Sequence, residues 1–162
     1  MKEIPLTQGK VAIVDDEDFE WLSQWRWYYT NGYAARSVRA GGKKMILMHR
    51  EICKTIKGME TDHQDGDRLN NQRTNLRSCT HSENQQNTRM TRRNKSGYKG
   101  VSYFGPAKKW KAKITLNGNE IFLGYFFALE DAAYAYDNAA KKLFGEFACT
   151  NFQRVQGNLG AL

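Results

Sequence analysis

Short hydrophobic runs separated by turn signals dominate the first 58 residues of the chain. Runs rich in Val, Ile, Tyr and Trp predict strands, and the Asn31-Gly32 pair between two of them favours a tight β-hairpin. DDEDFEWLSQ has acidic residues where a helix begins, and REICKTIKG ends at a glycine, so both predict short helices. The expected strands cover residues 10–14, 26–30, 33–39 and 43–49, and the expected helices cover 15–24 and 50–58.

Hydrophobic residues nearly vanish between Met59 and Asn87. Such a stretch is usually either disordered or a functional site. Its end favours a site, because Thr80-His81-Ser82-Glu83 is a capping box, in which the Thr and Glu side chains satisfy backbone donors at a helix start. A helix is therefore expected to begin at Glu83 or close by, with Asn84 in its first turn.

The strand pattern returns after residue 97 and is followed by one long helix. Strands are expected at residues 98–104, 109–116 and 120–126, with Asn117-Gly118 as a hairpin turn. The helix at 129–145 places one apolar stripe toward the sheet: Leu129, Ala132, Ala133, Tyr136, Ala140 and Leu143. We therefore predict an α+β protein, in which N-terminal hairpins and a polar segment precede a three-stranded antiparallel sheet packed on one helix.

Charge separates the two halves of the chain. The net charge is +8, and residues 92–162 carry 11 Lys/Arg against 5 Asp/Glu, whereas residues 1–91 carry 14 against 12. This asymmetry favours phosphates as the partner. The three scattered cysteines argue against a disulfide framework or a thiolate zinc site, and no apolar run approaches the length of a membrane span. A reducing cytoplasm fits, and no membrane partner is expected.

Asp62, His63, Asn75 and Asn84 form a candidate catalytic set within the polar stretch. Asn75 follows His63 by twelve residues and Asn84 by twenty-one. Carboxylate and amide oxygens suit Mg²⁺ or Mn²⁺, and a histidine beside them can take a proton from water near neutral pH. An Asn carbonyl in the intervening loop could hold the ring by accepting its Nδ1 proton. The set therefore predicts metal-assisted hydrolysis.

The same segment resembles the HNH endonuclease family with its ββα-metal fold, in particular the homing-type enzymes of phages and mobile introns. The matching stretches are MHREI at 48–52, DHQDGDRLNNQRTNLR at 62–77 and THSENQQN at 80–87. The resemblance implies that His63 is the general base and that Asn75 orients it. It also implies that Asp62 and Asn84 bind one divalent ion, Mg²⁺ with Mn²⁺ as a substitute. His49 and His81 have no comparable support as a base; we expect His49 to be structural or to contact DNA.

Residues 96–152 resemble the plant ethylene-response-factor, or APETALA-type, DNA-binding domain, which also accompanies mobile HNH endonucleases. The matching stretches are SGYKGVSYF, KKWKAKI, FLGYF, EDAAYAYDNAAKKLFG and ACTNF. The resemblance implies that the sheet enters the major groove of double-stranded DNA. Together with the basic linker, it assigns DNA contacts to Arg92, Arg93, Lys95, Lys99, Trp110, Lys111, Lys113, Thr115 and Phe122.

Two features of this second resemblance need separate expectations. Trp110 is placed on the sheet surface by family position, although the residue pattern alone would make it core. Lys99 and Thr115 stand where the family has arginines, Lys113 where it has an acid, and Phe122 where it has a tryptophan. Because lysine lacks arginine's bidentate fork for guanine, the family's target sequences do not transfer. A similar choice arises for Trp21, Trp25 and Trp27, which could form a platform on which nucleic-acid bases stack or could belong to the hydrophobic core. We favour the core.

These observations predict a metal-dependent DNA endonuclease that leaves 5′-phosphate and 3′-hydroxyl ends. Residues 1–91 would form the nuclease domain with its hairpin extension, and residues 92–162 the basic linker and DNA-binding domain. One site cuts one strand, so a double-strand break requires a homodimer or two successive nicks. The alternatives are a non-catalytic DNA-binding regulator on an HNH scaffold and, with less support, an RNA-binding protein. The expected setting is a phage or mobile element acting in the cytoplasm of a bacterial host.

Overall fold

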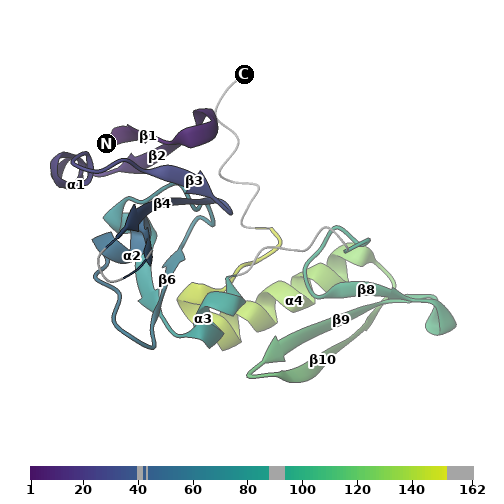
Figure 1. The fold of residues 1–162 in the computed structure, drawn as a ribbon. Coiled ribbons are helices and arrows are strands. Elements are labelled where there is room, and N and C mark those ends of the chain that lie inside the picture. Colours follow the sequence, from purple (N-terminus) through teal and green to yellow (C-terminus); the bar gives the residue numbers. More distant parts are fainter. Residues whose placement is uncertain (40–41, 43, 88–93, 153–162) are drawn as a thin grey trace. The chain divides into compact units, whose positions relative to one another are not determined.

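The computed structural model describes residues 1–39, 42, 44–87 and 94–152 (Figure 1). The chain forms two compact units, Met1–Asn84 and Gln85–Leu162, and each is described by itself. None of the helices in the described ranges combines the length and the apolar character needed to cross a membrane.

Three β-hairpin systems build the first unit. A two-stranded sheet pairs β1 with β2, a three-stranded antiparallel sheet has the order β3-β4-β5, and β6 pairs with β7. The strands are β1 (Lys2–Pro5), β2 (Val11–Val14), β3 (Tyr28–Thr30), β4 (Tyr33–Val38), β5 (Lys44–Leu47), β6 (Glu60–His63) and β7 (Leu76–Cys79). The helices are α1 (Asp16–Leu22) and α2 (Met48–Ile52), and α3 (His81–Gln86) begins in this unit and ends in the second. The short 3-10 turns are η1 (Thr7–Gly9) and η2 (Arg73–Asn75).

Local signals in the sequence account for most of these boundaries. Asn31 and Gly32 both have positive φ, 50° and 91°, as the tight turn between β3 and β4 requires. The predicted capping box forms in both directions, since the Thr80 backbone N–H donates to the Glu83 carboxylate (2.7 Å) and the Glu83 N–H donates to the Thr80 hydroxyl (3.3 Å). The helix it caps begins at His81, two residues earlier than expected.

Two elements differ from the sequence expectations. Strand β1 was not predicted, and it forms because Ile4 is buried while its neighbours Glu3 and Pro5 are exposed, the alternation of a half-buried strand. Helix α2 covers Met48–Ile52 instead of residues 50–58. The helix cannot continue past Lys54, whose φ of 48° is left-handed, so the chain turns before it reaches Gly58.

The core of the first unit confirms the core interpretation of Trp27. Its ring is buried with Val14, Leu22 and Met48, and its indole N–H donates to the Leu22 carbonyl at 2.8 Å. Trp21 and Trp25 pack against this cluster while remaining half-buried. The aromatic residues of this segment therefore serve packing, and the hairpins and α2 together form the support on which β6 and β7 lie.

The second unit is a three-stranded antiparallel sheet, in the order β10-β9-β8, with α4 along one face (Figure 1). Its elements are β8 (Val101–Phe104), η3 (Gly105–Ala107), β9 (Lys109–Leu116), β10 (Asn119–Phe126), α4 (Leu129–Phe144) and η4 (Gly145–Phe147). This arrangement confirms the predicted sheet and helix. Leu143 was wrongly placed in the buried stripe: it is 37% exposed, and Phe144 is buried in its place. The helix ends at Gly145, as expected.

Gly100 lies where the sheet and α4 approach most closely. Its φ is +74°, and a Cβ built there would overlap the Tyr136 ring and lie 2.6 Å from the Lys113 carbonyl oxygen. Because these are two independent obstacles, we expect Gly100→Ala to destabilise the second unit by about 2–5 kcal/mol, from left-handed strain plus overpacking. Gly97→Ala is the matched control, since Gly97 also has positive φ, +78°, but nothing lies within 4 Å of its Cβ position.

Hydrogen exchange measured by mass spectrometry on the full chain tests this expectation. Peptides from residues 98–152 should lose protection in Gly100→Ala and lose much less in Gly97→Ala, while peptides from residues 1–84 report the unaffected unit. Equal protection losses in the two variants would show that close packing at Gly100 has no role.

Candidate active site and DNA-binding face

The predicted catalytic residues converge on the β6–β7 hairpin. Asp62 and His63 are the last two residues of β6, and Asn75 immediately precedes β7. Asp62 lies opposite Arg77 and His63 opposite Leu76 across the strand pair. All three predicted residues are buried, so the polar stretch is folded into the unit rather than extended in water. Neighbouring strand residues point to opposite faces, which gives Asp62 and His63 separate surroundings.

The His63 ring lies among aromatic side chains and contacts the buried Asn71. Its centroid lies 4.9 Å from that of His49 and 6.2 Å from that of Tyr33, and its Nε2 lies 3.4 Å from the Asn71 side-chain oxygen. Burial lowers the pKa of His63 below its usual value, against the opposing effects of the Asn71 hydrogen bond and of Asp65. The ring is therefore neutral at pH 7, the form that can accept a proton.

Asn71 contacts one nitrogen of the His63 ring. Its amide nitrogen donates to the Leu69 carbonyl at 3.0 Å, which turns the amide oxygen toward His63. An amide oxygen only accepts hydrogen bonds, so this contact favours the tautomer with the proton on Nε2 and the lone pair on Nδ1. Asn71 is fully buried, and its backbone N–H donates to the Ile13 carbonyl of β2 at 2.7 Å. Asn71, which contacts the ring, was not among the residues that the sequence predicted.

Asn75, expected to orient the base, has a different set of hydrogen bonds. Its side-chain nitrogen donates to the Asp65 carboxylate (3.0 Å) and to the Asn70 carbonyl (2.8 Å), and its side-chain oxygen accepts from the Asp65 N–H (3.0 Å). Its backbone carbonyl accepts from the Gln64 N–H at 2.9 Å. These bonds shape the loop that carries Asn71. No sequence signal distinguished the two asparagines, because both lie in the same polar loop.

Asp62 forms a buried ion pair with Arg77. The Nε and Nη2 atoms of Arg77 both donate to the same carboxylate oxygen, Oδ2, at 2.9 and 2.7 Å. The side chains are only 6% and 12% exposed, so this arginine fixes the direction of the carboxylate. Sequence reasoning missed Arg77, because its position opposite Asp62 follows from the strand register.

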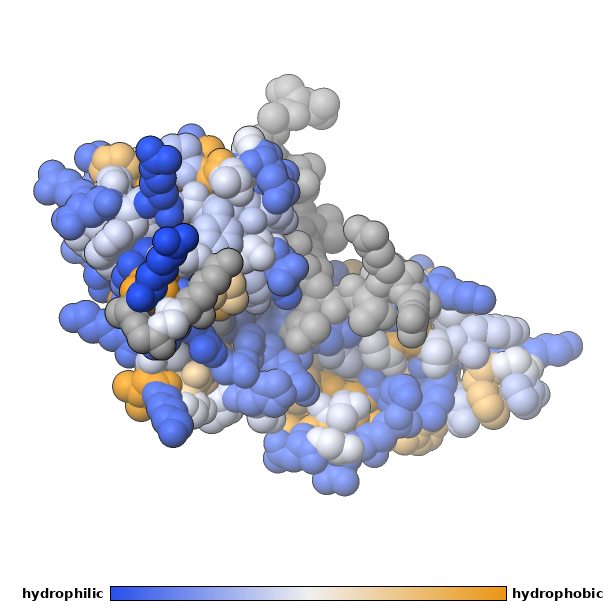
Figure 2. All heavy atoms as spheres, in the orientation of Figure 1, coloured by the Kyte–Doolittle hydropathy of each residue, from blue (hydrophilic) through white to orange (hydrophobic). Residues whose placement is uncertain are grey.

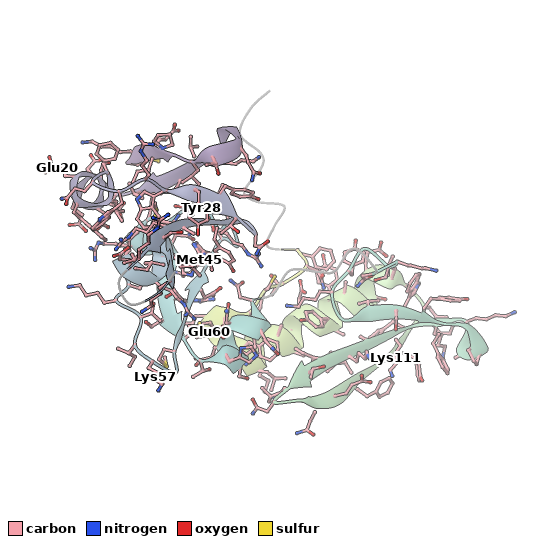
Figure 3. The ribbon with its side chains drawn as sticks, viewed as in Figure 1. Glu20, Tyr28, Met45, Lys57, Glu60 and Lys111 are labelled. Carbon is pink, nitrogen blue, oxygen red and sulfur yellow. The ribbon has the colours of Figure 1, made fainter. Side chains whose placement is uncertain are left out.

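Asn84 reaches the β6–β7 hairpin from α3. Its side-chain nitrogen donates to one carboxylate oxygen of Glu60, and the other oxygen lies 2.7 Å from Nδ1 of His81 (Figure 3). The hydrogen bonds from Asn84 and His81 hold the pKa of Glu60 below its usual value. Glu60 and Asp62 alternate onto the same face of β6, so α3 places Asn84 on the face that carries Asp62. Glu60, a second carboxylate on this face, was also missed.

The donor set on this face fits a magnesium-type ion better than a zinc-type ion. Asp62 and Asn84 carry oxygen atoms of the kind that bind hard ions, although no group of three or more His, Cys, Asp or Glu side chains within the described residues is placed to hold a metal ion. A hard ion such as Mg²⁺ needs few protein ligands, since it keeps several waters and binds phosphate oxygens. The residues present therefore fit the divalent ion that the sequence predicts.

The N-terminal hairpin and α1 hold the loop between β6 and β7 in place. Ile13 of β2 accepts from Asn71 and donates to the Leu69 carbonyl at 2.8 Å. Two oxygens of Asp15 accept from the Gln72 side chain (3.1 Å) and from the Arg73 N–H (2.8 Å). The fully buried Asp18 carboxylate accepts from the Arg73 guanidinium at 2.7 and 2.8 Å. The acidic run therefore anchors the loop as well as starting α1.

The sheet of the second unit has one covered face and one open face. Ala112 and Ile114 of β9 are buried against α4, whereas Lys111, Lys113 and Thr115 alternate onto the opposite face. Phe122 of β10 lies opposite Lys113 and is 52% exposed. Four of the predicted DNA-contacting residues thus share the open face; Figure 3 labels Lys111.

Other predicted DNA-contacting residues lie elsewhere. The expectation that Trp110 lies on the open face was wrong. Trp110 alternates onto the same face of β9 as Ala112 and packs against the core, and its ring centroid lies 5.2 Å from that of Tyr103. Lys99 precedes β8, and its ammonium donates to the Gln86 carbonyl at 2.8 Å. Lys95 is exposed in the segment before it. Arg92 and Arg93 lie outside the described residues.

Comparisons with known proteins agree with this geometry. The sequence model of the HNH endonuclease family matches residues 49–86. An uncharacterized HNH endonuclease of Acanthamoeba polyphaga mimivirus is 32% identical over 150 residues, spanning 89% of this chain and 76% of the relative. Protein 3.8 of Escherichia phage T7 is 34% identical over 92 residues, 57% of this chain and 75% of that protein. The chain belongs to the HNH endonuclease family, which supports nuclease activity.

The second unit has a different set of relatives. An ethylene-responsive transcription factor of Arabidopsis thaliana is 36% identical over 106 residues, which cover 62% of this chain and 64% of that protein. An AP2-like ethylene-responsive transcription factor of the same plant is 36% identical over 93 residues, or 52% of this chain and 17% of the relative. These similarities support a DNA-binding domain in the C-terminal part of the chain, with DNA as the partner.

The buried histidines make the stability of the first unit depend on pH. Burial, followed by the neighbouring His63, lowers the pKa of His49 to about 3 from 6.5. Between these values the unfolded chain binds a proton that the folded chain does not, so stability rises with pH across this window. We expect His49 alone to raise the free energy of unfolding by about 1.4 kcal/mol per pH unit across this window. This contribution to stability is lost progressively as the pH falls below 6.5.

Urea unfolding of the full chain at several pH values between 4.5 and 7.5, followed by tryptophan fluorescence, measures this slope. His49→Phe removes the titrating group while keeping an aromatic ring in the pocket. The pH dependence of its free energy of unfolding should therefore correspond to about one proton fewer than in the wild type. An unchanged slope in His49→Phe would contradict the assignment, whatever the absolute stability of the variant.

Proposed function

We propose that this protein is a metal-dependent, homing-type DNA endonuclease in which residues 1–91 cut and residues 92–162 hold duplex DNA. The observation that carries the proposal is the state of His63, a buried imidazole whose lowered pKa keeps it neutral and whose Nε2 contacts Asn71, at the end of the strand that also carries Asp62. Binding DNA alone requires no such arrangement, which argues against the regulator that keeps only an HNH scaffold.

In the proposed reaction, His63 acts as the general base. Its Nδ1 takes a proton from water, the water oxygen bonds to the phosphorus, and the bond from phosphorus to the 3′ oxygen breaks. The products are a 5′-phosphate and a 3′-hydroxyl, the latter protonated from solvent. Asn71 is a positioning residue in this scheme, because it holds Nε2 and so directs Nδ1. Asn75 acts one step further away, by shaping the loop around Asp65 and Asn70.

Asp62 and Asn84 would hold the divalent ion, Mg²⁺ with Mn²⁺ as a substitute. When bound, such an ion stabilises the negative charge that develops on the scissile phosphate and on its leaving oxygen. Arg77 positions the Asp62 carboxylate through Oδ2, and Glu60 positions the Asn84 amide. One such site cuts one strand, so cleavage of both strands would need two copies of the chain or two successive nicks.

The open sheet face and the basic linker would supply DNA binding. Lys111, Lys113, Thr115 and Phe122 line the face, and Lys95 and Lys99 precede it. Neutralising phosphates with these lysines would localise the nuclease on duplex DNA and make binding salt-dependent. The similarity to plant transcription factors supports DNA as the partner of this chain.

Loss of the oxygen ligands should abolish cleavage. Asp62→Asn is preferable to alanine, because it removes the charge while leaving the mostly buried Arg77 guanidinium a hydrogen-bond acceptor. We expect Asp62→Asn and Asn84→Ala each to reduce plasmid nicking by at least about 10²-fold in Mg²⁺, since an ion contributes several kcal/mol to the transition state. Glu20→Gln, an exposed carboxylate on α1, is the matched control and should cut normally (Figure 3). Undiminished nicking in excess EDTA would exclude the metal site.

Replacing His63 should separate chemistry from binding. His63→Ala removes the base but no metal ligand and no lysine, so the single-turnover nicking rate should fall about 10²–10⁴-fold while the dissociation constant for duplex DNA changes little. Because burial lowers the pKa of His63, the wild-type rate should stay high down to pH 6.5 and decline only below that value. A His63→Ala protein that cuts at the wild-type rate across pH 6–9 would rule out this residue as the base.

A further inference from the structure

Exposed aromatic side chains cluster on the open face of the sheet in the second unit. We call Phe104 of β8 with Phe122 and Tyr125 of β10 the aromatic cluster. Tyr125 stacks on Phe104 at 5.1 Å and meets Phe122 at 4.9 Å. The three side chains are 36%, 52% and 43% exposed, and Figure 2 shows hydrophobic areas among hydrophilic ones on this unit.

The aromatic cluster is not part of the core. The opposite face of the same sheet already supplies the core, where Val101, Ala112 and Ile114 pack with α4. Large aromatic side chains grouped away from a filled core usually mark an interaction surface. We therefore interpret the aromatic cluster as a surface that binds a partner.

A β-bulge places Tyr125 on the open face. Phe122 and Tyr125 are separated by an odd number of positions, which would put them on opposite faces of a regular strand. The register shifts between Phe122 and Gly124, so that Phe122 lies opposite Lys113 and Tyr125 opposite Lys111. Gly124, with φ of +138°, accommodates the irregularity. The bulge therefore brings the Phe122 and Tyr125 rings to the same face of the sheet.

The charges around the cluster indicate a polyanionic partner. Lys109, Lys111 and Lys113 lie on β9 between the strands that carry the rings, and the Lys111 ammonium lies 5.9 Å from the Phe122 ring centroid. Lys111 and Lys113 pair with Glu120, which is a surface interaction. Exposed pairs of this kind contribute little, so phosphates can replace the carboxylate. Duplex DNA, the partner of the proposed function, fits this combination of charge and apolar surface.

The side chains on this face point to a particular base feature. Strands β8, β9 and β10 contain no arginine, the residue that recognises guanine with a bidentate fork. Phenyl rings instead make apolar contacts with the C5-methyl group of thymine, which is exposed only in the major groove. We propose that the aromatic cluster recognises thymine methyl groups in the major groove, so that the protein selects thymine-containing target sites. This inference rests on the proposed function, because it assumes that the open face binds duplex DNA.

The test replaces thymine with deoxyuracil, which removes the methyl group and changes no hydrogen-bonding edge. The full-length protein first selects duplexes from a randomised library, and the preferred sequence is then made with thymine and with deoxyuracil. We expect affinity to fall about fourfold for each contacted methyl group that is removed. Phe122→Ala should weaken binding to the thymine duplex and abolish the difference between the two duplexes.

Controls distinguish failure of the inference from failure of the proposed function. Tyr134→Ala, an exposed aromatic residue on α4, should retain the preference for thymine. Phe104→Ala, on the other edge strand, repeats the test if Phe122→Ala does not fold. Tight binding to both duplexes with equal affinity would overturn the inference and leave the proposed DNA binding standing. Binding to neither duplex would overturn both, and tighter binding to the unpaired strand would overturn the inference in favour of base stacking.

Discussion

The fold of the first unit depends on how a mostly polar loop, with Leu69 as its one residue packed on the core, is held in place by hydrogen bonds. Residues 64–75 are fixed by backbone hydrogen bonds to Ile13 and by the carboxylates of Asp15 and Asp18. Buried polar groups left unpaired are costly, so the bonds to the fully buried Asn71 and Asp18 matter most once the loop is folded inward. Because Asn71 belongs to this loop, the direction of the His63 ring is decided by contacts that begin more than fifty residues earlier in the chain.

In the proposed function, burial serves catalysis at His63 while it opposes stability at the same site. The aromatic pocket around His63, formed in part by His49 and Tyr33, excludes water and keeps the imidazole neutral. The same exclusion leaves the Nδ1 atom of His49 without a hydrogen bond, which is unusual for a buried polar atom. A base ready to accept a proton and a fold that tolerates acid are therefore competing requirements, and this unit favours the base.

Local patterns predicted most elements, and long-range contacts explain what they missed. The Asn31-Gly32 turn, the capping box at Thr80 and the final helix depend on neighbouring residues, so the sequence alone reveals them. The choice between Asn71 and Asn75 depends on a distant strand, and the pairing of Asp62 with Arg77 depends on register. Trp110 was misplaced because family position was preferred over alternation along β9, which gives the correct face.

The anchoring of the loop also bears on how such nucleases can be recombined. The family resemblance recognises residues 49–86, yet the loop inside that segment is held by Ile13, Asp15 and Asp18. A graft that moved only the recognised segment onto another scaffold would carry the catalytic residues without the hydrogen bonds that orient them. The transferable part of this protein is therefore set by its hydrogen-bond network, which reaches back to β2, and not by the extent of its motif.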